Sequence, residues 1–191
     1  KPYGVHKQQF LMQSLYELQQ ALIERGQTLH VLEGEPVSLL KARINEQNID
    51  EVVYGEQFGL YEQRQINLLK AHCPNTKFAG SQQDTLFKQS DLPFDLSELP
   101  KHFTSFRKKV EAATSPISLS TLPNGLLPQP ITLCAKKPLE RIANNGVMHG
   151  GLKSAQTHLK QYFSGLLPST YKITRNELDG FNNTTKFSTW L

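Results

Sequence analysis

Helical patterns alternate with short β-type runs through the first 80 residues, and this alternation limits the fold more than any other feature. Apolar residues spaced three and four apart predict helices, and runs rich in Val, Leu and Tyr predict strands. The predicted order is a helix at 6–25, a strand at 28–32, a helix from Pro36, a strand at 50–54, a helix at 58–73 and a strand at 77–79. Strands separated by helices pair in parallel. We therefore predict a partial, doubly wound parallel α/β sheet that lacks its first βαβ piece.

Beyond this region the chain changes character. Seven of its 11 prolines fall between positions 93 and 138, and one helix is predicted there, at 98–112. This is typical of a long connector. A new helical pattern begins after Gly150. The predicted organisation is therefore an α/β domain at 1–92, a connector with one helix at 93–148, and the beginning of an all-α domain at 149–191.

The net charge also differs between the first and second halves of the chain. Residues 1–95 carry a net charge of −3 and residues 96–191 carry +7, which sum to the formal +4 of the chain. A basic second half is typical of a protein that meets a polyanion. The first residue is Lys1 and the last residues resemble the opening of a helix without a body, so we expect a fragment that lacks both ends of a longer protein.

Composition excludes several classes of protein. Hydrophobic residues make up 38% and charged residues 20%, which argues against wholesale disorder. No apolar run is long enough to span a bilayer, and no leader pattern is present. The two cysteines, Cys73 and Cys134, have no zinc-type spacing. We expect a cytoplasmic monomer without a membrane partner, a metal site or a disulfide framework.

The usual catalytic motifs are absent: the sequence has no GxSxG, HExxH, P-loop or complete dinucleotide fingerprint. We therefore predict no catalytic side chain. His149, beside two glycines, is more typical of a structural residue than of a functional one. Thr184, Thr185, Lys186 and Ser188 place hydroxyls and a cation together where a helix is expected to begin. Such a cluster either binds a phosphate or diphosphate or simply caps the helix, and the residues alone favour the cap.

Other positions carry weaker signals. Arg175 and Lys172 either contact a nucleic-acid backbone or form a solvated face. Glu62 follows a strand end, where ligands bind in open α/β sheets, and a carboxylate there accepts hydrogen bonds from a heterocycle. The alternative is that Glu62 is an ordinary solvated surface residue. Phe103, Phe106 and Val110 form an apolar stripe that predicts a docking helix.

The order of segments over nearly the whole chain resembles the DNA photolyase/cryptochrome family, and within it the cryptochrome DASH branch. The strings FLMQSL and LHVLEGEP are similar to those shared across the family. The strings that resemble the DASH branch are FTSFRKKVE at 103–111, TYKITRN at 170–176 and TTKFSTWL at 184–191.

The resemblance implies an α/β antenna domain, a connector and an all-α domain that binds FAD. It implies 5,10-methenyltetrahydrofolate as the antenna, and blue-light repair of cyclobutane pyrimidine dimers in single-stranded DNA by electron transfer from reduced FAD. The full-length protein is then a deoxyribodipyrimidine photo-lyase, and the fragment alone is inactive. Two alternatives stay open: a blue-light receptor without repair activity, and a generic α/β nucleotide-binding module with a helical tail.

The same resemblance implies roles for particular residues. Tyr171 is similar to a flavin-contacting tyrosine, Arg175 to an arginine on the DNA backbone, and Glu62 to an antenna-binding carboxylate. The segment that wraps the FAD diphosphate and ribityl chain corresponds to Thr184, Thr185, Lys186, Phe187 and Ser188. Trp190 is expected to pack, not to carry electrons. The chain departs from the family at Leu152, where an acidic residue is usual, and at Asn182 and Asn183.

Overall fold

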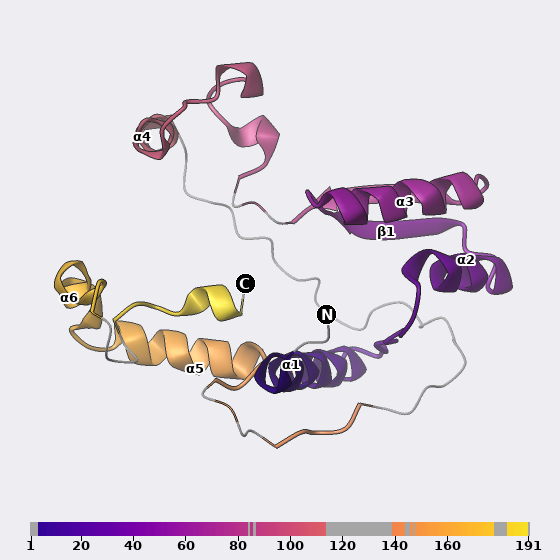
Figure 1. The fold of residues 1–191 in the computed structure, drawn as a ribbon, viewed down its shortest axis with the longest axis horizontal. Helices are drawn as coiled ribbons and strands as arrows, with labels where there is room; N and C mark the ends of the chain where they lie inside the picture. Colours follow the sequence, from indigo (N-terminus) through magenta and orange to yellow (C-terminus); the bar gives the residue numbers. More distant parts are fainter. Residues whose placement is uncertain are drawn as a thin grey trace. The chain divides into compact units, whose positions relative to one another are not determined.

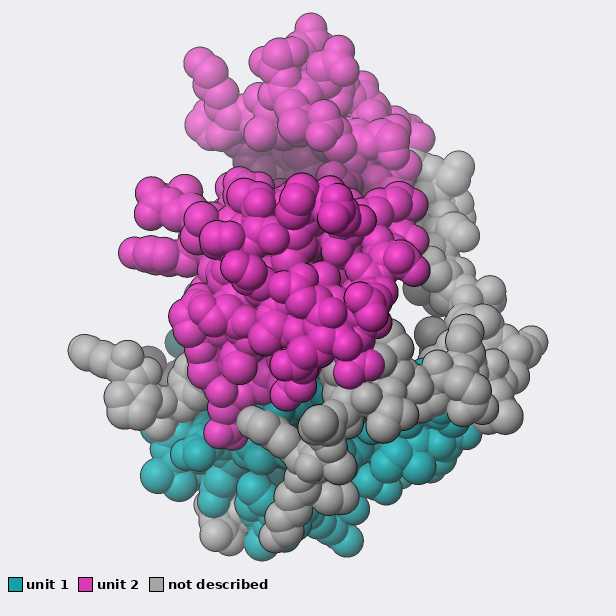
Figure 2. Space-filling model, turned by 90° about the vertical axis from the view of Figure 1, so that its right-hand side faces the viewer, with its two compact units in different colours: residues 1–31, 125–191 teal, residues 32–124 magenta. Residues whose placement is uncertain are grey.

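A computed structural model describes residues 4–83, 85, 87–113, 139–143, 146, 148–177 and 183–190. The chain divides into two compact units, one formed by residues 1–31 with 125–191 and the other by residues 32–124 (Figure 2). Half of the predicted connector, including the prolines from Pro116 to Pro138, lies outside the described residues, as does Asn182. The domain boundaries at 92 and 148 stay predictions.

The second unit contains a two-stranded parallel sheet. Strands β1 (Glu51–Glu56) and β2 (Lys77–Gln82) pair in register from Glu51 opposite Lys77 to Glu56 opposite Gln82. Helix α3 (Leu60–His72) connects them and lies along β1 in Figure 1. Helix α2 (Pro36–Glu46) precedes the sheet, with Pro36 in its first turn. The parallel α/β class predicted from the alternation is confirmed.

A small hydrophobic core holds these elements together. Val37 and Ile44 of α2 pack with Leu69 of α3 and with Cys73, and Leu69 is only 2% exposed. Residues of the neighbouring elements complete the cluster: Ile49, Val52, Ile66 and Phe78. This core therefore joins α2 to the second half of α3 and to the first residues of β1 and β2.

The predicted strand at 28–32 is wrong. These residues have no assigned secondary structure, and within the described residues the sheet consists of β1 and β2 alone. A strand exists only when a neighbour accepts and donates its backbone hydrogen bonds. Alternating apolar residues are therefore not sufficient here.

The remainder of the second unit is helical. Two short 3-10 helices, η1 (Gln89–Asp91) and η2 (Leu96–Glu98), precede helix α4 (Phe103–Ala113). The helix begins later than predicted, and Pro100 keeps Leu99 out of it because a proline disfavours the helical conformation of the preceding residue. Leu99 is accordingly extended, with ψ of 122°. Val110 is buried, whereas Phe103 is exposed and packs beside Phe106.

The first unit joins the two ends of the chain. It contains α1 (Val5–Ile23), α5 (Leu152–Phe163), α6 (Leu167–Thr174) and the 3-10 helix η3 (Phe187–Thr189). Helix α1 meets the beginning of α5 (Figure 1). None of the helices in the described part of the chain is both long and apolar enough to cross a membrane.

Hydrogen bonds of polar side chains connect α1 to the beginning of α5. The buried amide of Gln13 accepts a hydrogen bond from the Gly150 N–H (2.9 Å), and Glu17 Oε1 accepts one from the Lys153 N–H (3.0 Å). A Cβ on Gly150 would collide with the Phe10 carbonyl, and one on Gly151 would collide with the Glu17 carboxylate. The two glycines therefore permit close approach of α1. The buried face of α1 includes Gln13 and Gln19, and parts of its predicted apolar stripe are exposed.

Candidate functional site

The predicted phosphate-binding residues form a tight turn followed by one helical turn. Lys186 is left-handed, with φ of 52°, and its N–H donates to Thr184 Oγ1 at 3.4 Å. Helix η3 begins at the next residue. Where the sequence predicts the opening of a longer helix, the described residues show a single 3-10 turn. The side chain of Ser188 lies outside the described part of the structure.

Helix α5 holds this turn through one polar contact and two ring contacts. His158 Nε2 lies 2.7 Å from the Thr185 carbonyl oxygen. The His158 ring lies 6.4 Å from the ring of Phe187 and 5.3 Å from that of Trp190. The turn is therefore attached to α5 both before and after Lys186.

Trp190 is a packing residue, as expected. Its indole Nε1 donates to the His149 carbonyl at 3.1 Å, and its ring lies 6.0 Å from that of Phe10. His149 itself has local contacts: Nδ1 is 2.7 Å from the Gly150 carbonyl and 3.2 Å from Ser154 Oγ. This geometry gives His149 the structural role expected of it.

The other two predicted residues of this unit lie on α6. Tyr171 is 42% exposed, and its carbonyl accepts from the N–H of Arg175, which ends the helix. Lys172 lies three residues before Arg175, so the two cations share one exposed side of α6. Asn183 Nδ2 donates to the Glu177 carbonyl at 3.1 Å and links the end of α6 to the turn. The predicted flavin residues are thus divided between α6 and the turn held on α5.

Glu62 lies in the first turn of α3, beside a hollow of about 290 Å³ in the second unit. The hollow lies between the carboxyl end of β1 and the first half of α3; its lining includes Tyr54, Gln57, Phe58, Glu62, Ile66 and Lys70. Lys70 Nζ donates to the Tyr54 hydroxyl at 3.1 Å, and Gln63 Nε2 to the Gln57 carbonyl at 3.2 Å. The place agrees with the rule for open α/β sheets.

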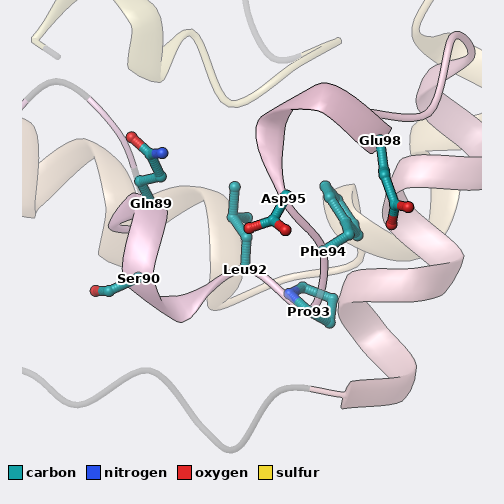
Figure 3. Close-up of a pocket in the computed structure, with 7 residues that line it drawn as sticks. All are labelled: Gln89, Ser90, Leu92, Pro93, Phe94, Asp95 and Glu98. Atoms are coloured by element: carbon teal, nitrogen blue, oxygen red, sulfur yellow. The ribbon is translucent and has the colours of Figure 1, made fainter.

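A larger hollow of about 630 Å³ lies between η1 and η2 (Figure 3). The Phe94 ring packs edge-on against Phe106 at 5.7 Å, and Lys109 Nζ lies 5.6 Å from its centre. The lining includes the carboxylates of Asp95 and Glu98 and no cationic side chain. The two carboxylates give this hollow a negative lining.

Sequence reasoning missed three residues that shape the first unit: Gln13, Glu17 and His158. Their partners are the backbone atoms of Gly150, Lys153 and Thr185. Neither glutamine nor glutamate in an amphipathic helix differs locally from a solvated residue. The only available signal was the pair of glycines, because adjacent glycines permit another backbone to approach closely.

Comparison with known proteins identifies the class. Residues 1–128 match the DNA photolyase family model, and the chain belongs to this family. Its relatives within the family include cryptochromes DASH. That of Idiomarina loihiensis is 40% identical over 193 residues, which cover 98% of this chain and 42% of the relative. The chain therefore spans about two fifths of the length of such relatives.

Solved structures agree with this placement. A cryptochrome from Synechocystis sp. PCC6803 superposes with a TM-score of 0.77 at 28% identity, covering 97% of this chain and 41% of that one. A class III photolyase from Agrobacterium tumefaciens superposes with a TM-score of 0.75 at 19% identity, covering 98% and 41%, and shows the shared fold. The chain is therefore a member of a specific family, and the hypothesis of a generic nucleotide-binding module no longer applies.

Proposed function

We propose that this chain is part of a blue-light-dependent flavoprotein of the cryptochrome DASH type that repairs cyclobutane pyrimidine dimers in single-stranded DNA. The turn at Thr184–Lys186 carries the proposal. It places two hydroxyls and an ammonium on three consecutive residues, and α5 holds it through His158 and Trp190. Hydroxyl donors and a cation are the groups that bind a diphosphate.

The chemistry of these residues fits FAD. Thr184 Oγ1 accepts from the Lys186 N–H and keeps its own proton for donation to a phosphate oxygen. Thr185 and Lys186 supply a second hydroxyl and a positive charge. Tyr171, half-exposed on α6, would contact the flavin. Reduced FAD, when bound, supplies the electron that light drives into the dimer.

Arg175 and Lys172 would bind the DNA backbone. Both are exposed at the end of α6, and neither has an ion-pair partner among the described residues. They contribute to the net charge of +7 in the second half of the sequence. Cations in such positions orient a strand and do not read its bases.

Glu62 would bind the antenna, 5,10-methenyltetrahydrofolate, through the amino and ring N–H groups of its pterin. The hollow beside Glu62 has aromatic side chains from Tyr54 and Phe58, on which a flat heterocycle packs. In full-length protein, Glu62→Gln should release most of the folate, measured by chromatography of the extracted chromophores. Glu98→Gln, at the other hollow, is the matched control and should retain it.

The FAD site is tested by a double substitution in full-length protein. Lys186→Glu with Thr184→Ala should purify with little flavin, measured by absorbance after denaturation. Lys160→Glu with Thr157→Ala changes the same residue types on the exposed side of α5 and should retain a full complement. A full flavin complement in the first variant would contradict the assigned site. The 191-residue chain alone should bind FAD poorly.

Repair is tested separately from cofactor binding. Full-length protein is reduced and illuminated with single-stranded DNA that contains pyrimidine dimers, and the remaining dimers are counted. Loss of dimers in the light but not in the dark supports the photo-lyase activity. Retention of all dimers by flavin-loaded protein would favour the blue-light receptor, the second candidate, because the relatives are named as cryptochromes.

A further inference from the structure

We infer that His158 is the positioning residue of the phosphate-binding turn: its imidazole N–H fixes the Thr185 carbonyl and thereby places Thr184, Thr185 and Lys186 for a diphosphate. This inference rests on the proposed FAD site. His158 lies on α5, 26 residues before Thr184, and belongs to none of the strings that carry the family resemblance.

The chemistry of the two atoms in this contact determines which of them donates the hydrogen bond. The Thr185 carbonyl oxygen only accepts hydrogen bonds, so His158 Nε2, 2.7 Å away, must donate. Helix α5 is a rigid support for this donor, and its Ala155 and Tyr162 are buried. The hydrogen bond therefore anchors a loop residue to a fixed element.

The same imidazole also packs against the far side of the turn. Phe187 and Trp190 lie at ring-centre distances of 6.4 and 5.3 Å from it, and Trp190 is anchored in turn by the His149 carbonyl. One side chain thus contacts the residue before Lys186 and the residues after it.

Lys186 shows why such an anchor is needed. Its φ of 52° lies in the left-handed region, which a residue with a side chain adopts only when its surroundings impose it. Without the hydrogen bond to Thr185, the turn can relax to more common conformations. The hydroxyls and the ammonium would then lose the arrangement that a diphosphate requires.

Two substitutions separate the donor from the ring. In full-length protein, His158→Phe keeps an aromatic ring and removes the donor, whereas His158→Gln places an amide N–H near the position of Nε2. We expect His158→Phe to raise the FAD dissociation constant about tenfold, as loss of a hydrogen bond predicts. His158→Gln should remain within about threefold of the unsubstituted protein. His6→Phe, at an exposed position in the first turn of α1, is the control and should have no effect.

Hydrogen exchange of the FAD-free protein gives a second readout. Amides of residues 183–190 should exchange at least about fivefold faster in His158→Phe, and near the original rate in His158→Gln. Unchanged FAD affinity in His158→Phe, or equal weakening in both variants, would overturn the positioning role. If Lys186→Glu with Thr184→Ala keeps full FAD affinity, the proposed site itself fails and the inference fails with it. Weakened binding in that double variant together with normal binding in His158→Phe refutes the inference alone.

Discussion

Replacing Glu17 by glutamine tests whether α1 supplies the negative charge at the beginning of α5. The N-cap of α5 is Gly151, which has no side chain, and the next residue is Leu152, which carries no charge. Glu17 Oε1 accepts from the Lys153 N–H at 3.0 Å, one residue into the helix. Its carboxylate thus lies where the helix dipole favours negative charge.

The effect of Glu17 on stability has two separate parts, one from its charge and one from its hydrogen bond. A charge near the N-terminus of a helix contributes about 0.3–1 kcal/mol, and a capping hydrogen bond contributes about 1 kcal/mol. Glu17→Gln keeps an acceptor oxygen and loses the charge, so its free energy of unfolding should fall by about 0.5 kcal/mol. Glu17→Ala loses both, so its free energy of unfolding should fall by about 1.5 kcal/mol, which corresponds to a decrease of roughly 3–6 °C in Tm.

The assay uses the only tryptophan of the chain. Trp190 lies in the same unit as Glu17, so its fluorescence during urea unfolding reports the correct unit. Glu33→Gln, at an exposed carboxylate, is the control and should change stability little. Leu152→Glu, at a residue that is 67% exposed, should restore most of the stability lost in Glu17→Gln. Equal effects of Glu17→Gln and Glu33→Gln, or no recovery of stability when Leu152→Glu is added to Glu17→Gln, would refute the reasoning.

Three further substitutions probe other parts of the chain. Gly150→Ala should destabilise the first unit by about 1–3 kcal/mol because its Cβ meets the Phe10 carbonyl, whereas Gly165→Ala, with open space around it, should not; both are measured by Trp190 fluorescence. Leu69→Ala should cost about 2–5 kcal/mol in the core of the second unit, measured by circular dichroism, and a loss below 1 kcal/mol would contradict its burial. Hydrogen bonds from Ser38 and then Val37 lower the pKa of Glu35, so its stabilising effect on α2 is present at neutral pH and declines as pH falls through that lowered pKa. The stability difference between Glu35→Gln and the unsubstituted protein should therefore shrink in acid, and a difference that grows instead would exclude this capping role.

Local patterns predicted the elements of the second unit because the forces that select them are local. Pro36 begins α2. Of the apolar residues that predicted α3 and β1, Ile66, Leu69 and Val52 lie in one core, whereas Leu60, Leu68 and Val53 are exposed. The strand at 28–32 failed because strand formation depends on a neighbour, which no local pattern supplies. The sequence also could not predict the left-handed conformation of Lys186, since the contact that holds its neighbour Thr185 comes from α5.

The candidate site was predictable only in part for the same reason. Family strings identified Thr184–Ser188, Tyr171 and Arg175 as candidates, and the structure places them in two separate parts of the first unit. The residues that support the turn and the α1–α5 junction act across long distances in the sequence. Gln13 and Gly150 are 137 residues apart. Side chains that bind a remote backbone atom have no periodicity of their own, so only the folded chain identifies them.

A ribosome releases α1 long before it makes the residues that α1 contacts. About 120 residues separate the end of the first segment, at Val31, from Gly150. At roughly 5–20 residues per second, synthesis of that interval takes on the order of 6–24 s. The second unit, residues 32–124, is complete within this time, and it can fold before α1 contacts Gly150. Leu11, Leu18 and Ile23 remain partly exposed even in the folded chain. The contact between α1 and the beginning of α5 therefore forms late in the synthesis of these residues.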